Sequence, residues 1–211
     1  VKIKVAGGPL EDDVRRIEIA REIVGPSGLV MVDANQVLDR NEALRRGLVY
    51  QELGVHWFEE PLRPHDTAGY TWLCDQLAIP VATGENHYGR HAGQELIAAR
   101  GCDILQPDAR RTGGPSEWME IAGLACANHV AVASHGGEGG TTHLLMATPT
   151  AIWCETGGKP KGPGMYVDRA RIEGGLIYAP EGIGFGTELR EETLEQFGVR
   201  DLAALPVGQA D

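Results

Sequence analysis

The stretch LVMVDAN, residues 29–35, is an apolar run that reaches an acidic residue, Asp33, and it sets the pattern of the chain. The pattern returns at intervals of 26 residues, with Glu59 in VHWFEEP and Glu85 in IPVATGEN. This interval is about the length of one strand and one helix with their loops. The repeat therefore predicts three successive parallel strands, each with a carboxylate at its C-terminal end.

These three carboxylates are candidate metal ligands. In barrel enzymes the C-terminal ends of the parallel strands carry the active site, and carboxylate oxygens are the hard ligands that Mg²⁺ prefers. Asp33, Glu59 and Glu85 together therefore predict a Mg²⁺ site. Each of them taken alone has a simpler interpretation, which is that it caps the helix following its strand.

Strand-like and helix-like segments alternate along the rest of the chain. Six successive crossovers predict a parallel sheet in an α/β fold, and we expect a TIM-type (β/α) barrel. A complete barrel has typically about 250 residues in eight strands. We therefore expect this chain to lack the first βα unit and to form a single domain, residues 1–211, from strands two to eight. The predicted strands are residues 1–5, 29–33, 55–60, 79–84, 103–107, 130–135 and 151–155, and the predicted helices are about 10–24, 39–53, 66–77, 89–100, 113–128 and 138–147, followed by a short β segment at 171–186 and a helix near 190–197.

The composition excludes several classes of protein. With 42% apolar and 23% charged residues the chain is globular, and its net charge of −11 without a cluster of basic and aromatic residues argues against nucleic acid as a partner. It has no apolar run of about 18 residues that would span a membrane. Four cysteines without a C-x-x-C pair are interpreted as reduced thiols of a cytoplasmic protein: Cys74, Cys102, Cys126 and Cys154.

Two lysines at the start of the chain are candidate proton-transfer groups. Lys2 and Lys4 are two residues apart, so on a strand both side chains point to the same face, which we expect to be the barrel interior. Two ammonium groups this close together, near a metal, disfavour each other's charge, which lowers a lysine pKa toward that of a working base. A K-x-K pair near a terminus, taken alone, is more often a solvated strand face.

The later strands end in residues that complete this picture. Asp108 follows the predicted strand at 103–107, and His135 ends the next one. Because these strands are neighbours, Asp108 is expected to hydrogen-bond the imidazole and support its protonated form. Glu155 ends the last strand. Arg111 either steadies a carboxylate near Asp108 or faces solvent.

Neighbours of these residues have two interpretations each. Glu60 is either a support for the metal site or an ion-pair partner, and Asn35 and Asn86 either support the site or shape turns. The run GGEGG at 136–140 suggests either phosphate binding or a loop that passes close to His135, and we favour the second.

Taken together, the motifs resemble a known family. KIK, VDAN, FEEP, TGEN, QPD followed by RRTGG, and SH are similar to the barrel domain of the enolase superfamily, in its mandelate racemase subgroup. The resemblance extends from Lys2 to about Glu155, and EGIGFG in the tail is also similar. Members of the family carry an N-terminal α+β capping domain over the barrel mouth, which we expect to be absent from this chain. That domain is the part that mainly shapes substrate specificity.

The resemblance implies specific roles for the candidate residues. The three carboxylates described first would bind Mg²⁺. Around the metal, Lys4 and His135 would be the acid/base pair, Asp108 would partner His135, Lys2 would lie against the substrate carboxylate, and Glu155 would hydrogen-bond that carboxylate. Enolase-superfamily enzymes pair a Lys or His base with Mg²⁺ at an ene-diolate.

The function that follows is abstraction of the α-proton from a small 2-hydroxy carboxylate. We favour an acid-sugar dehydratase that produces a 2-keto-3-deoxy acid, and a mandelate-type racemase or epimerase is the alternative. An alternative of another class is a non-catalytic barrel remnant or binding protein, because a barrel without a cap would not exclude water from the site. A homo-oligomer is expected from the resemblance.

Overall fold

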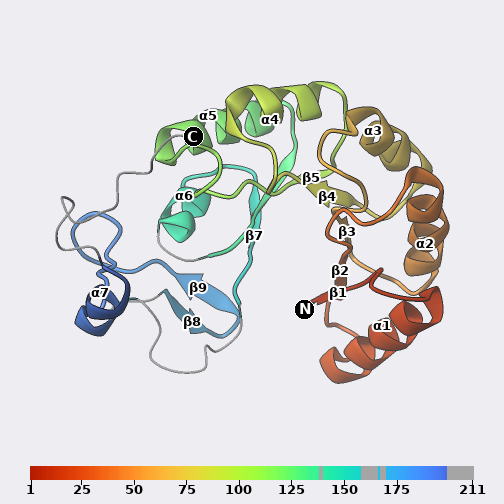
Figure 1. Cartoon of the computed structure of the whole chain (residues 1–211), viewed down its shortest axis with the longest axis horizontal. Helices are drawn as coiled ribbons and strands as arrows, with labels where there is room; N and C mark the ends of the chain where they lie inside the picture. Colours follow the sequence, from red (N-terminus) through yellow and green to blue (C-terminus); the bar gives the residue numbers. More distant parts are fainter. Residues whose placement is uncertain (138–139, 158–165, 167–169, 199–211) are drawn as a thin grey trace, which may run out of the picture.

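Figure 1 shows the chain as a computed structural model: an open arc of strands with helices along its outer side. The structure describes residues 1–137, 140–157, 166 and 170–198. In this part of the chain, a seven-stranded sheet runs in chain order from β1 to β7, and all of its neighbouring strands pair in parallel. The predicted α/β fold of barrel type is therefore confirmed, as a partial barrel.

The elements follow the predicted order. The strands of the sheet are β1 (Lys2–Lys4), β2 (Met31–Asp33), β3 (Phe58–Glu59), β4 (Val81–Thr83), β5 (Ile104–Leu105), β6 (Ala131–Ser134) and β7 (Ala151–Cys154). The helices between them are α1 (Leu10–Val24), α2 (Arg40–Glu52), α3 (Thr67–Gln76), α4 (Gly89–Ala98), α5 (Pro115–Ala127) and α6 (Thr141–Met146). The tail contains an antiparallel pair, β8 (Arg171–Glu173) and β9 (Leu176–Tyr178), and the helix α7 (Glu191–Phe197).

The predicted strands, and the predicted helix at 138–147, are longer than the elements in the structure. The strands have two to four residues each, shorter than predicted, because the sheet pairing stops where each strand reaches its loop. The predicted helix at 138–147 begins at Thr141, and residues 138–139 lie outside the described part. Within that part, no helix has the length and apolar character needed to cross a membrane.

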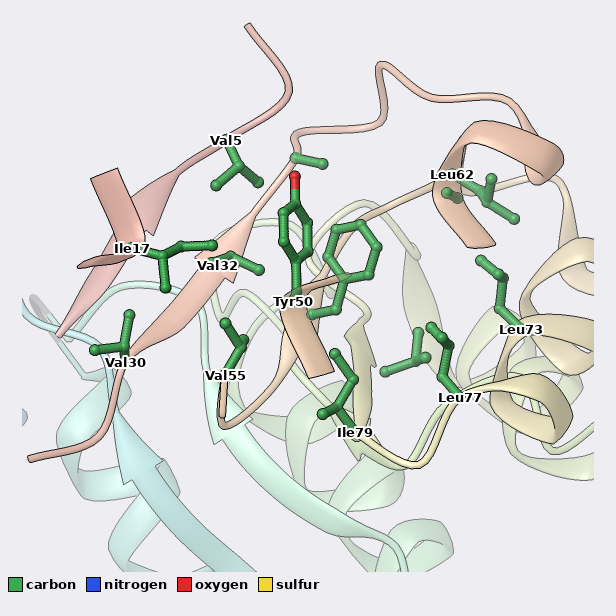
Figure 2. Packing of buried hydrophobic residues seen from close by; sticks show 14 of the residues in the cluster. Val5, Ile17, Val30, Val32, Tyr50, Val55, Leu62, Leu73, Leu77 and Ile79 are labelled. Atoms are coloured by element: carbon green, nitrogen blue, oxygen red, sulfur yellow. The ribbon is translucent and has the colours of Figure 1, made fainter. Parts of the chain in front are cut away.

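The main core lies between the outer face of the sheet and the helices. Figure 2 shows Val32 of β2 facing Ile17 of α1 and Tyr50 of α2. Tyr50 also packs edge-to-face on Phe58 of β3, with ring centroids 5.2 Å apart. A second apolar cluster, which includes Trp118 of α5, continues the same layer beneath the later helices. Burial of this layer fixes each strand's orientation, so alternate side chains must point to the inner face of the arc.

The inner face carries a separate apolar layer, which we call the floor. It consists of Met31, Trp57, Ala82, Ile104 and Ala133, which form one buried cluster. Because strand side chains alternate, a residue two positions beyond a floor residue points to the same inner face one layer higher. Asp33 and Glu59 are two positions beyond Met31 and Trp57. The candidate site therefore lies directly above the floor.

A surface ion-pair cluster on α2 gives a pH prediction. Hydrogen bonds from Arg45 and Arg46 lower the pKa of Glu42 to about 2. A carboxyl group with a lowered pKa stabilises the fold above its ordinary pKa of 4.5 and loses this effect as the pH falls toward about 2. We expect Glu42→Gln to reduce the unfolding free energy by about 0.5–1 kcal/mol at neutral pH and to have almost no effect near pH 2. Urea unfolding at both pH values measures this, with Glu52→Gln as control because Glu52 is exposed at the end of the same helix. An equal effect at both pH values would contradict the prediction.

Candidate active site

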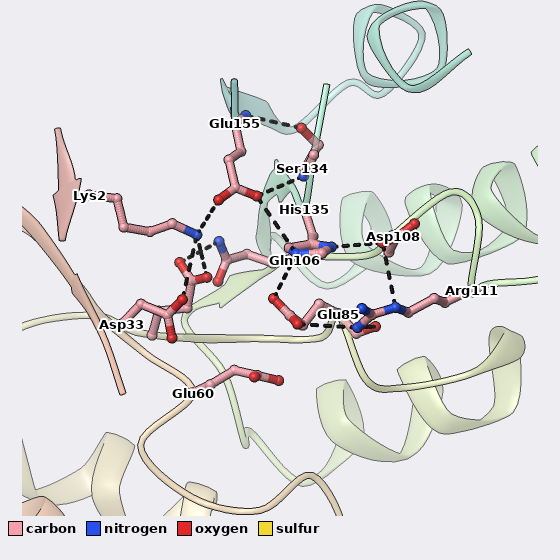
Figure 3. Close-up of polar contacts among 12 residues, drawn as sticks. Lys2, Asp33, Glu60, Glu85, Gln106, Asp108, Arg111, Ser134, His135 and Glu155 are labelled. Carbon is pink, nitrogen blue, oxygen red and sulfur yellow. Dashed lines mark hydrogen bonds and ion pairs between the residues drawn. The ribbon is translucent and has the colours of Figure 1, made fainter. Parts of the chain in front are cut away.

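The ends of β1, β2 and β3 bring two lysines and two carboxylates together on the inner face. Lys4, Asp33 and Glu59 are in register across the three strands. Lys2 Nζ lies 2.5 Å from Glu59 Oε1 and 3.9 Å from Asp33 Oδ2, and Lys4 Nζ contacts Asp33 Oδ2. Both carboxylates are buried. Figure 3 shows the Lys2 ammonium between the carboxylates of Asp33 and Glu155.

Glu59 is held by two neutral donors on one oxygen and by a cation on the other. Trp57 Nε1 donates to Glu59 Oε2 at 3.2 Å, and Gln106 Nε2 donates to the same oxygen at 2.9 Å, while Lys2 takes Oε1. Burial, and the nearby charge of Asp33, raise the pKa of Glu59 to about 7 against the opposing effect of Lys2. A group of buried anions with a raised pKa would be stabilised by further positive charge.

The ammonium of Lys2 lies among carboxylates that raise its pKa. Burial lowers the pKa of Lys2, but the charge of Glu59 and the contact with Glu155 raise it more, so the pKa of Lys2 lies above its ordinary value. The Lys2 Nζ to Glu155 Oε1 distance is 2.7 Å. Carboxylates from β3 and from the end of β7 surround the Lys2 ammonium. The expected lowering of a lysine pKa beside a bound metal stays a prediction.

A second group lies at the ends of the later strands. His135 Nδ1 is 2.7 Å from Asp108 Oδ2, as predicted from the adjacency of their strands, and His135 Nε2 is 3.2 Å from Glu85 Oε2. Burial opposes ionisation of Asp108, but hydrogen bonds from Arg110 and His135 lower the pKa of Asp108 to about 2. Asp108 is therefore a fixed negative charge that orients the imidazole of His135.

Arg111 and the amides support the carboxylates of this group. Arg111 Nη1 lies 3.2 Å from Glu85 Oε1 and 2.9 Å from Asn86 Oδ1, so Arg111 steadies carboxylates, which decides between its two interpretations. Glu60 is buried and accepts hydrogen bonds from Asn86 Nδ2 at 2.9 Å and from Gln36 Nε2 at 2.8 Å. These contacts make Glu60 and Asn86 supporting residues.

Glu155 connects the two groups. Its Oε1 contacts Lys2, and its Oε2 lies 4.0 Å from His135 Nε2 and accepts a hydrogen bond of 2.7 Å from the Gly136 backbone N–H. A Cβ on Gly137 would lie 2.6 Å from the carbonyl oxygen of Glu155. The start of the glycine run therefore lets the loop pass close to the site, while residues 138–139 lie outside the described part.

The three predicted metal ligands do not cap the helices that follow them. Asp39 caps α2 by accepting from the Glu42 N–H, and Asp66 caps α3 by accepting from the Gly69 N–H. α4 follows Tyr88, whose side chain makes no capping hydrogen bond. The carboxylates at the strand ends face the inner side of the arc instead, so the simpler interpretation of Asp33, Glu59 and Glu85 is excluded.

The carboxylates suit a hard divalent cation by their chemistry. As they stand, no three His, Cys, Asp or Glu side chains in the described residues form a metal-binding arrangement. Asp33 and Glu59 face the Lys2 ammonium, and Glu85 faces His135 and Arg111. The raised pKa of Glu59 and the all-oxygen donor set fit Mg²⁺. Ligation by this set stays a prediction.

Comparison with known proteins identifies the family. A sequence model described as "Enolase C-terminal domain-like" matches residues 1–193. The chain belongs to the enolase superfamily. This confirms the resemblance inferred from the motifs, and the superfamily's barrel agrees with the observed sheet.

Dehydratases and cycloisomerases are among the relatives that this chain resembles. The chain is 36% identical to L-talarate/galactarate dehydratase of Salmonella typhimurium over 74% of this chain and 39% of the relative. It is 32% identical to D-galactarolactone cycloisomerase of Agrobacterium fabrum over 95% of this chain and 57% of the relative. The crystal structure of L-talarate dehydratase from Polaromonas sp. JS666, complexed with Mg and L-glucarate, is similar with a TM-score of 0.84 at 31% identity, over 92% of this chain and 54% of that one. The chain thus spans about half the length of these relatives or less.

Sequence reasoning missed two donors to Glu59 and one to Asp108. Gln106 is part of the QPD motif, but its hydrogen bond to Glu59 crosses from the end of β5 to β3. The spacing of the two residues along the chain does not indicate this contact. Trp57 is two residues before Glu59, so on a strand both side chains point to the same face. This spacing could have indicated the hydrogen bond from Trp57 to Glu59. Arg110 is two residues after Asp108, and its guanidinium group donates hydrogen bonds back to the Asp108 carboxylate.

Proposed function

We propose that this chain is the barrel of a Mg²⁺-dependent enzyme that removes the α-proton of a small 2-hydroxy carboxylate. One observation carries the proposal: the Lys2–Lys4 group and the Asp108–His135 pair lie on two sides of the carboxylates Glu59 and Glu85. An α-proton next to a carboxylate is very weakly acidic, because its removal adds a second negative charge. Catalysis therefore needs positive charge beside the substrate together with groups that accept and return protons.

Asp33, Glu59 and Glu85 are the residues that would hold Mg²⁺. When bound, the ion supplies the positive charge that stabilises an ene-diolate. The Lys2 ammonium lies 2.5 Å from Glu59 and 3.9 Å from Asp33, and this contact supports positive charge beside the pair. The Mg complex of the talarate dehydratase from Polaromonas supports the same choice of metal.

The side chains of this chain then divide the proton transfers. Lys2 offers its ammonium to the substrate carboxylate. The Lys4 amine accepts the α-proton. His135 in its protonated form donates a proton to the β-hydroxyl group as the C–O bond breaks, so that water leaves and an enol remains. The enol takes up a proton at C3 and its 2-hydroxyl group releases a proton to solvent, which gives the 2-keto-3-deoxy acid. Asp108, at 2.7 Å from His135 Nδ1, stabilises the imidazolium before the transfer.

Acid-sugar dehydration is supported by the relatives. Talarate/galactarate dehydratase and arabinonate dehydratase both match this chain. A racemase or epimerase is supported by a different observation, which is that Lys4 and His135 contact opposite ends of the carboxylate set, Asp33 and Glu85. Bases on two faces would return the proton to either side of the same ene-diolate.

A screen of acid sugars and 2-hydroxy acids tests the proposal. The full-length protein is incubated with Mg²⁺ in D₂O, and 2-keto acid formation and exchange of the α-hydrogen are followed separately. Keto acid supports the dehydratase, whereas exchange without keto acid supports the racemase or epimerase. If the Mg²⁺-loaded protein produces neither with any substrate, the chain is a non-catalytic member of the family and the proposal is overturned.

Gln106 gives a prediction about the metal site. Because Gln106 holds Oε2 of Glu59, we expect Gln106→Leu to weaken Mg²⁺ binding by about tenfold. Isothermal titration calorimetry with MgCl₂ measures this. Gln36→Leu is the matched control, because Gln36 donates in the same way to Glu60, which is not among the predicted ligands. If both variants lose the same affinity, the contact with Glu59 has no specific role.

A further inference from the structure

A buried carboxylate outside the site ties the end of β1 to two helices. Asp13, in the first turn of α1, is 1% exposed. Its Oδ2 accepts hydrogen bonds from Arg46 Nη1 at 2.5 Å and from Tyr50 Oη at 2.6 Å, both on α2. Arg46 provides the positive charge that a buried carboxylate needs. These contacts link α1 to α2 through Oδ2 of Asp13. They leave Oδ1 of Asp13 available for another partner.

That further partner is the backbone just after β1. The Ala6 N–H lies 3.0 Å from Oδ1 and 3.1 Å from Oδ2 of Asp13. Ala6 has a φ of 62°, a left-handed conformation that residues other than glycine rarely adopt. Such a conformation persists only where the surrounding structure holds it. The Asp13 carboxylate binds the N–H group of this residue and so opposes its return to an ordinary conformation.

The position of Lys4 depends on this stretch of backbone. The Lys4 side chain is 62% exposed, so packing does little to hold it, while its ammonium contacts Asp33. On one side its backbone is fixed by β2, since Lys4 pairs with Asp33 and the Val5 N–H donates to the Asp33 carbonyl oxygen at 3.0 Å. On the other side the chain turns away at Ala6. The contact between Ala6 and Asp13 therefore determines the direction in which β1 ends.

We propose that Asp13 is a positioning residue for Lys4, which it aligns with the reacting carbon by holding Ala6 in its left-handed conformation. The proposal rests on the proposed function, in which Lys4 moves the α-proton. A small displacement of a proton-transfer group has a large kinetic effect, because the transfer needs close alignment. The His135 side of the site is built from other strands. Loss of Asp13 should therefore slow the proton transfer of one substrate epimer and spare the other.

Asparagine at position 13 tests this in the full-length protein. We expect Asp13→Asn to lower kcat for the α-epimer whose proton Lys4 moves by about ten- to a hundredfold. Exchange of the α-hydrogen of the opposite epimer, followed in D₂O, should change by less than about twofold. Asp12→Asn is the matched control, because Asp12 is the exposed neighbour that pairs with Arg15 at 3.9 Å. This control should leave both epimers unaffected.

Two further variants separate positioning from stability. Glycine adopts positive φ without strain, so Ala6→Gly combined with Asp13→Asn should recover most of the lost rate. Ala6→Val keeps the Asp13 charge but places a β-branched residue at positive φ, and it should produce the same loss for one epimer. If Asp13→Asn does not fold, the Ala6→Val variant decides.

The outcomes distinguish this proposal from the proposed function. Equal losses for both epimers, or no recovery with glycine at position 6, would show that Asp13 acts on stability alone and would overturn the proposal. If the wild-type protein exchanges neither epimer, the proposed function fails, and crystal structures then decide the positioning role. Displacement of Lys4 from Asp33 in Asp13→Asn, or in Ala6→Val, supports it, and an unchanged contact contradicts it.

Discussion

Replacement of His135 by asparagine is expected to lower kcat by about 10²- to 10⁴-fold for substrates whose proton the imidazole donates or removes. Asparagine keeps a polar group near Asp108 but cannot transfer a proton. Mg²⁺ affinity should change little, because His135 is not among the predicted ligands. Lys4→Ala should abolish exchange of the α-hydrogen in the epimer that faces Lys4 and His135→Asn in the opposite epimer. Both variants should lose 2-keto acid formation, because the two residues act on the same substrate in dehydration. Steady-state kinetics with 2-keto acid detection, and α-hydrogen exchange of each epimer, measure both effects.

A histidine outside the site provides the control for this experiment. His91 is exposed on α4, and His91→Asn should retain the wild-type rate. Full activity of His135→Asn with both epimers would remove His135 from the reaction, and full activity of Lys4→Ala would do the same for Lys4. Equal losses of α-hydrogen exchange for both epimers in both variants would contradict the assignment of one epimer to Lys4 and the other to His135.

Replacement of Glu59 by glutamine is expected to weaken Mg²⁺ binding by about a hundredfold or more. The change removes one negative charge from the predicted ligand set while keeping the shape of the side chain and its contact with Gln106. Replacing a residue that only hydrogen-bonds a metal ligand lowers metal affinity by about ten- to a hundredfold, so the loss of a ligand's own charge should have at least as large an effect. Calorimetric titration with MgCl₂ measures the affinity, and thermal unfolding verifies that the variant is folded.

Glu60→Gln is the matched control for Glu59. Glu60 is the adjacent buried carboxylate, and its hydrogen bonds with Gln36 and Asn86 make it a support for the site. We expect its loss to weaken Mg²⁺ binding by about tenfold at most. An unchanged affinity in Glu59→Gln, or a larger loss in Glu60→Gln, would show that the ligand assignment is wrong.

The sequence predicted the features that depend on neighbouring strands. Asp33 and Glu59 end successive strands because their apolar runs recur at one period, and the Asp108–His135 contact followed from the order of their strands. In both cases the partners are fixed by parallel pairing. The interval alone was enough to infer that they lie on one edge of the sheet.

The contacts that were missed cross between distant strands or depend on the detailed course of a loop. Lys2 contacts Glu155 across the arc, from the first strand of the sheet to the end of β7. No spacing along the chain encodes that distance. The hydrogen bonds between Ala6 and Asp13 depend on a positive φ at an alanine, a choice that local preferences disfavour.

The indole of Trp57 belongs to the apolar floor, and its N–H also holds a carboxylate of the layer above, Glu59. Phenylalanine or leucine at this position would preserve most of the burial on which folding depends, but neither has a hydrogen to give to that carboxylate. The residue at this position is therefore constrained by its hydrogen bond as well as by packing. Variants that look conservative by volume should accumulate at Ile104 or Ala133 more readily than at Trp57, although all three share the same apolar surroundings.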